Sequence, residues 1–211
     1  MLSACADKHV DKKTGEIKDS WEEIIENIHN GKAQKIYKPG DWKTVITNAY
    51  STSIPSQSIP MQLARFDYDV QSSGALCPTT WVNMKGWRWD GRFFMDQSLS
   101  AKIRDTYFPS PIRENLLLFK KDYYEGRKLK TETIYIGNLS ESDVTTRYAS
   151  IFPDQASRIR KSAIDDSTVS YILKDKPTDG GHKYIDHNGA IRGCAYFTQI
   201  DNESSVFCFC I

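Results

Sequence analysis

SVFCFCI (residues 205–211) is an apolar strand pattern that ends on the last residue of the chain, and it decides the fold more than any other stretch. Before it come a second strand pattern, SYILKDK (170–176), and a hairpin pattern, KYIDHNGAIRGCAYFTQI (183–200). Strand-forming residues on both sides of an Asn-Gly turn are typical of a β-hairpin. A chain that stops on a buried strand has its end held in a sheet, so we predict that the C-terminus is structural and not a tail.

Helices and strands are both predicted upstream of this region. An amphipathic helix is indicated by the capping-box spacing of Ser20 and Glu23 and by the apolar residues at helical spacing that follow. Two further helices are predicted, one from Ser98 and one with Ser110 as its N-cap, which Pro111 follows in the cap-then-proline order preferred at a helix start. Strands are predicted at 42–50, at 61–70, at 77–82 and as two runs within 116–137.

The order of these elements predicts an α+β protein with antiparallel sheets and two or three helices, because strands and helices do not alternate as they do in a parallel sheet. The turn at 38–41 follows a short predicted strand. The prolines and serines of 51–60 predict a loop. A slip in the alternation near Ala64 and Arg65 indicates a β-bulge.

The composition is that of a globular protein without a strong charge. The 211 residues suffice for one hydrophobic core, and 28 basic residues against 27 acidic ones leave a net charge of +1. We therefore predict no nucleic-acid partner, and we predict no membrane span because no apolar stretch approaches about 20 residues. Residues 20–211 are predicted to be a single domain, and the polar residues 1–19 a flexible or attachment arm.

The five cysteines are odd in number and include no Cys-x-x-Cys pair. Cys208 and Cys210 share one face of a strand, which does not make a zinc site by itself. We predict free buried thiols. A disulfide from Cys194 to Cys208 or Cys210 is the alternative.

The sequence contains no phosphate-binding loop, nucleophile elbow or zinc-protease motif. The histidines around Asp186 fall in the predicted hairpin, where exposed polar residues are expected. The pair Asp67 and Asp69 is interpreted as lying on a solvent-exposed strand face, and a role as hydrolase carboxylates is the alternative. We predict no enzymatic activity, no catalytic residues, no cofactor and no metal.

An aromatic cluster follows the predicted strand at 77–82. It comprises Trp81, Trp87, Trp89, Phe93 and Phe94. If the loop is exposed, its rigid rings can stack on a sugar or on a protein partner, and the alternative is that they fill the core. The candidate ligand-binding residues are Trp87, Arg88, Trp89, Asp90, Tyr171 and Tyr184.

The order of patterns over residues 20–211 resembles an uncharacterised domain of gut bacteria and their phages, found in surface and tail-associated proteins. The patterns that carry the resemblance are SWEEIIENIHNGKAQKIYKPGDWKTV, MQLARFDYDV, CPTTWVNM, SPIRENLL, IYIGNLSESDV, SYILKDK, KYIDHNGAIRG and SVFCFCI. Phe209, Cys210 and Ile211 match the end of that family's last strand, whereas Tyr171, Leu173 and Lys174 depart from its Trp-x-Leu-Arg-Ser-like strand.

That domain is similar to the C-type-lectin-like fold, which formylglycine-generating enzymes and phage receptor-binding proteins share. The resemblance implies a stable platform whose loops vary and bind ligands. The Glu-Pro-Asn calcium triplet of lectins is absent from the sequence, as is the cysteine pair of the formylglycine-generating site, so neither calcium-dependent sugar binding nor that catalysis is implied.

Three functions are compatible with these observations. The leading one is a non-catalytic binding module of a phage or prophage tail, or of an extracellular surface, which recognises a host glycan or protein. Other tail or fibre proteins are expected partners, and homo-oligomerisation is left open. The alternatives are a surface lipoprotein anchored at Cys5 of a Leu-Ser-Ala-Cys box, and a cell-wall carbohydrate hydrolase that uses Asp67, Asp69 or Asp186.

Overall fold

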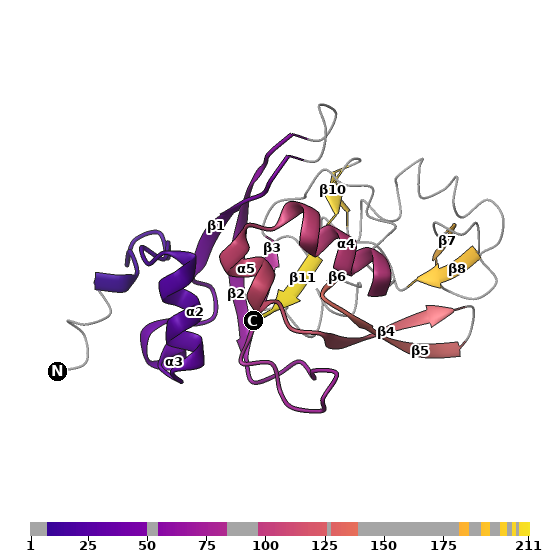
Figure 1. Ribbon diagram of the computed structural model, residues 1–211, viewed down its shortest axis with the longest axis horizontal. Helices are drawn as coiled ribbons and strands as arrows, with labels where there is room; N and C mark the ends of the chain where they lie inside the picture. Colours follow the sequence, from indigo (N-terminus) through magenta and orange to yellow (C-terminus); the bar gives the residue numbers. More distant parts are fainter. Residues whose placement is uncertain are drawn as a thin grey trace.

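The computed structural model describes residues 8–49, 55–83, 97–125, 128–138, 182–185, 191–194, 199–201, 204–205 and 207–211. Their fold is α+β, as predicted, and is built on a five-stranded antiparallel sheet (Figure 1). In spatial order the strands are β1 (Trp42–Ile46), β2 (Ser58–Phe66), β3 (Thr79–Asn83), β11 (Phe207–Cys210) and β6 (Ile136–Asn138). None of the helices in these ranges is long and apolar enough to span a bilayer.

Four helices are described: α2 (Trp21–His29), α3 (Ala33–Ile36), α4 (Gln97–Tyr107) and α5 (Ser110–Asn115). The smaller strand pairs are β4 (Phe119–Glu125) with β5 (Lys128–Ile134), β7 (His182–Ile185) with β8 (Ile191–Cys194), and β9 (Gln199–Asp201) with β10 (Ser204–Ser205). Helices α2 and α3 lie beside β1, and the β4–β5 ribbon lies toward the opposite end of the molecule (Figure 1). The predicted strand at 170–176 lies outside the described residues.

The C-terminal strand lies inside the sheet, which confirms the prediction. Phe209 pairs with Trp81 of β3 on one side and with Ile136 of β6 on the other. Phe207 and Phe209 join the core formed with the helices, whereas Cys208 and Cys210 lie on the other face and are also buried. A strand that is buried on both faces reads as a continuous apolar run, which explains the pattern SVFCFCI.

Helix α2 begins where the sequence predicts it. Ser20 is the N-cap, its hydroxyl accepts from the Glu23 backbone N–H, and the Glu23 carboxylate accepts from Ser20 N at 2.8 Å. The apolar residues of this helix face the sheet and are buried at Trp21, Ile24, Ile25 and Ile28. The predicted bulge is also present, because the pairing of β2 with β3 shifts between Leu63 and Arg65.

Three local predictions are wrong. The short strand expected before the turn at 38–41 is the helix α3, and the N-cap of α5 is Pro109, one residue before the expected Ser110. The third concerns the predicted loop at 51–60, whose last three residues belong to β2.

Pro60 is tolerated in β2 because of where its nitrogen points. Trp21 Nε1 donates to Thr44 O at 2.9 Å, so the backbone of Thr44 faces away from its cross-strand partner Pro60. The nitrogen of Pro60 therefore points away from β1. Its missing N–H thus costs no hydrogen bond of the β1–β2 ladder.

The structure differs from the predicted arm for residues 8–19, which pack along the edge of the sheet. Val10 forms an isolated bridge with Ile17, and both side chains are buried. Ile17 N donates to Trp42 O at 2.8 Å, and Trp42 N donates to Gly15 O at 2.9 Å. The segment thus covers the open edge of β1, and its two well-separated apolar residues form too sparse a pattern to reveal this from sequence.

Candidate functional site

Of the six predicted ligand-binding residues, Tyr184 falls in the described part of the chain. Trp87, Arg88, Trp89, Asp90 and Tyr171 lie outside the described residues. The backbone of Tyr184 lies in β7 opposite Arg192 of β8. Their role in binding therefore stays a prediction.

Trp81 is the one member of the aromatic cluster whose side chain is described. It is fully buried, and its ring meets that of Trp21 edge-on at 4.9 Å between centroids. Its Nε1 donates to Thr79 Oγ1 at 3.0 Å. Trp81 therefore fills the core. At this position the alternative interpretation of the aromatic cluster holds, in which the rings are buried and do not contact a ligand.

The predicted carboxylate pair is split between two environments. Asp67 is exposed, has a φ of 45° and accepts a hydrogen bond from Gln34 Nε2. Asp69 is buried, and its Oδ2 accepts from Thr80 Oγ1 at 2.5 Å. The interpretation of both as solvent-exposed is wrong for Asp69, whose carboxylate is directed inward to the Thr80 hydroxyl and whose backbone oxygen accepts from Cys77 N.

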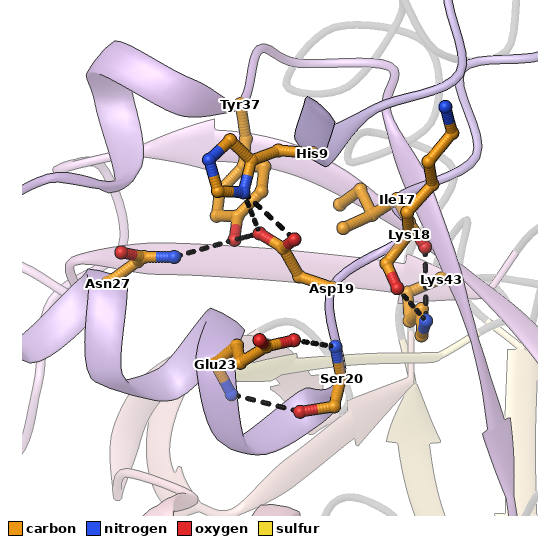
Figure 2. A network of polar contacts seen from close by, with 9 residues as sticks. All are labelled: His9, Ile17, Lys18, Asp19, Ser20, Glu23, Asn27, Tyr37 and Lys43. Carbon is orange, nitrogen blue, oxygen red and sulfur yellow. Dashed lines mark hydrogen bonds and ion pairs between the residues drawn. The ribbon is translucent and has the colours of Figure 1, made fainter. Parts of the chain in front are cut away.

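A chain of polar contacts links the N-terminal segment to α2 and to the residue after α3 (Figure 2). Asp19 accepts from His9 Nδ1 at 2.8 Å and from the Tyr37 hydroxyl at 2.5 Å. Asn27 Nδ2 in turn donates to the Tyr37 oxygen at 3.0 Å. Because a carboxylate only accepts, the proton on this side of the imidazole sits on Nδ1.

This chain of contacts was not predicted, because its members are far apart in sequence and occur singly. An Asp-His pair is also used for proton transfer in enzymes. Here the buried carboxylate of Asp19 is already engaged by two donors, and these donors tie three segments together. The arrangement therefore supports a structural role, and Lys43 adds to it by donating to Ile17 O at 3.0 Å (Figure 2).

The Tyr37 hydroxyl should make this end of the molecule sensitive to alkaline pH. Burial raises the pKa of Tyr37 well above its usual value, and the hydrogen bond to Asp19 raises it further. A raised pKa in the folded state means that the stabilisation is fully present below the unfolded tyrosine pKa of about 10 and is lost as pH rises above it.

We expect Tyr37→Phe to cost about 1–2 kcal/mol of unfolding free energy at pH 7, because it removes the donor to Asp19. The difference between wild type and variant should shrink as pH rises from 9 to 11. Urea denaturation at each pH measures it. A difference that stays constant with pH contradicts the assignment of this proton.

The opposite face of the sheet holds a second buried polar group of residues. Cys77, Cys208 and Cys210 are free and buried, so the predicted free thiols are confirmed for these three and the alternative disulfide from Cys194 is not formed. The Thr80 hydroxyl lies 3.6 Å from Cys210 Sγ while it donates to Asp69. Within the described ranges, no three His, Cys, Asp or Glu side chains converge in a metal-binding arrangement.

Exposed apolar side chains gather on the hairpin at 68–76, where Val70 pairs with Leu76. We call Tyr68, Val70 and Leu76 the hairpin patch; they are 44%, 36% and 48% exposed. The Arg65 guanidinium lies 5.4 Å from the centroid of the Tyr68 ring. The only sequence pattern that pointed to this patch was the alternation of apolar residues, which continues past the bulge to Tyr68 and Val70.

Comparison with protein-family models, with curated proteins and with solved structures gives no match to this chain. The class of this protein is therefore defined by its fold alone. It is an α+β protein whose antiparallel sheet incorporates the C-terminal strand, with an exposed apolar hairpin at one side.

Proposed function

We propose that this protein is a non-catalytic binding module of a phage or prophage tail, or of an extracellular surface, and that it recognises a host surface glycan or protein. The observation that carries the proposal is the hairpin patch. The ring of Tyr68 is exposed beside Arg65, and the aliphatic side chains of Val70 and Leu76 are exposed on the same hairpin. Aromatic and arginine side chains supply much of the binding energy at contact surfaces.

The state of the acidic residues also favours binding over catalysis. Asp19 and Asp69 are buried and accept hydrogen bonds from neighbouring side chains, so they support the scaffold. Asp67 is exposed and lies in a different environment from Asp69. A carbohydrate hydrolase needs two carboxyl groups on either side of one bond, and this pair does not supply them.

The fold is consistent with a C-type-lectin-like platform, which is part of the proposal. In that architecture a rigid sheet supports irregular segments that touch the ligand. The segment with Trp87 and Trp89 follows β3, the strand that pairs with β11 at the centre of the sheet. The proposed binding residues are therefore attached to the most deeply buried part of the scaffold. Other tail or fibre proteins are the proposed partners within the particle.

We expect Tyr68→Ala, Trp87→Ala and Trp89→Ala each to weaken binding to host cells or to a glycan array by about tenfold or more. Truncation removes a rigid ring that gains contact area at small entropic cost. Ile46→Ala is the matched control, because Ile46 is an exposed apolar side chain (64%) of β1 that belongs neither to the hairpin patch nor to the proposed binding residues. Wild-type binding by all three aromatic variants would refute the proposal.

A further inference from the structure

The hairpin patch continues onto β4, because the hairpin pairs with the start of that strand. Gln71 forms an isolated antiparallel bridge with Phe119 of β4, and Lys120 N donates to Val70 O at 2.7 Å. Residues directly opposite each other in an antiparallel pair point to the same face, so the side chains of Val70 and Lys120 are neighbours. Phe119 is fully buried, whereas Val70 is 36% exposed and Lys120 is exposed. The face that carries Val70 and Lys120 is therefore the solvent face.

Three side chains form a row on this face. Val70 is central, with its bridge partner Leu76 on one side and Lys120 on the other. Toward β2, the Arg65 guanidinium lies 5.4 Å from the centroid of the Tyr68 ring. The apolar side chains of the hairpin patch are therefore bordered by two cations, an ammonium group and a guanidinium group.

Two acidic residues that are close to the patch in sequence have partners elsewhere in the fold. Asp69 is the only acidic residue within 68–76, and its buried carboxylate accepts from Thr80. Asp67 is exposed and accepts from Gln34 Nε2 of α3. An apolar surface with cations beside it is complementary to a partner that carries carboxylates next to apolar groups.

We propose that the hairpin patch binds a short apolar segment of a partner protein that carries an aspartate or glutamate side chain. Val70 and Leu76 supply aliphatic contact area for the apolar side chains of that segment, and the two cations attract its carboxylate. A sugar stacks on the open face of an aromatic ring, and the single ring of the patch already lies beside Arg65. The patch therefore favours a protein over a glycan. This inference rests on the proposed function and narrows it to a protein ligand for this surface.

The test is to immobilise the full chain and to select binders from a surface-displayed library of random peptides. We expect the selected peptides to combine apolar residues with aspartate or glutamate, and we expect Leu76→Ser to lose them. A selected peptide should bind Lys120→Glu about tenfold more weakly than wild type, and its affinity for wild type should fall as salt rises. The same peptide with lysine in place of its acidic residue should recover binding to Lys120→Glu, which a purely structural role of Lys120 would not produce.

Lys13→Glu is the matched control, because Lys13 is an exposed lysine in the turn at 11–15 and its substitution changes the net charge by the same amount. This variant should keep wild-type affinity. The inference is overturned if the selection enriches no peptide, or if the enriched peptides bind Lys120→Glu as tightly as wild type.

Failure of the proposed function is a separate result, which is read from the binding of the three aromatic variants to host cells. If these variants lose host-cell binding while no peptide is selected, a glycan is the ligand, and the proposed function stands without this inference. If they keep wild-type binding to host cells and glycans, the proposed function fails, and the peptide selection still decides what the hairpin patch binds.

Discussion

Phe209→Ala should lower the free energy of unfolding by about 3–5 kcal/mol, the largest effect that we expect from a single substitution. Phe209 is fully buried in β11, between β3 and β6. Its ring lies 5.7 Å from that of Phe108 at an angle of 83°, and 6.4 Å from that of Trp21. Truncation therefore leaves a cavity where the sheet meets the helical residues.

Urea denaturation followed by tryptophan fluorescence measures this effect. Phe209→Leu is the matched control, and it should cost much less because it keeps most of the buried volume. Ile46→Ala should change stability by no more than about 0.5 kcal/mol, because that side chain is exposed. A loss below about 1 kcal/mol for Phe209→Ala contradicts the central position of β11.

Removal of residues 1–18 should cost about 3–6 kcal/mol, because it exposes the surfaces that Val10 and Ile17 bury. It also removes the His9 donor to Asp19 and the partners of Trp42. The uncovered edge of β1 can then pair with another chain. Chemical denaturation measures the first effect, and light scattering measures the second.

Removal of residues 1–7 alone is the control for this truncation, because it leaves the contacts of His9, Val10 and Ile17 in place. Ile17→Ala is a finer test, with an expected loss of about 2–4 kcal/mol, since the side chain is fully buried. If the protein without residues 1–18 unfolds at the same urea concentration as wild type, the segment at 8–18 is an arm after all.

The elements that sequence reasoning located correctly are those whose signal is local. Ser20 and Glu23 satisfy each other within one helical turn, so their spacing alone predicts the start of α2. The bulge in β2 follows from a break in alternation at Ala64 and Arg65. The apolar run at 205–211 similarly predicted the buried β11.

Features that depend on distant partners could not be predicted in this way. Pro60 can lie in β2 because the backbone carbonyl of its partner Thr44 points away from it. That direction is set by the distant Trp21, whose Nε1 donates to Thr44 O. The buried carboxylate of Asp69 accepts a hydrogen bond from Thr80, which lies in the next strand, β3. The exposure of the hairpin patch could not be predicted from the sequence, because apolar residues in a strand are more often buried.

The sequence by itself determined the α+β class, the capped helix at residue 20 and the terminal strand, because periodicity and capping act over a few residues. Only the tertiary structure decided that residues 8–19 cover a sheet edge, that His9, Asp19 and Tyr37 meet, and that the Thr80 hydroxyl contacts both Asp69 and Cys210. Such contacts join residues from distant parts of the chain, and no local pattern encodes which of them the folded backbone brings together.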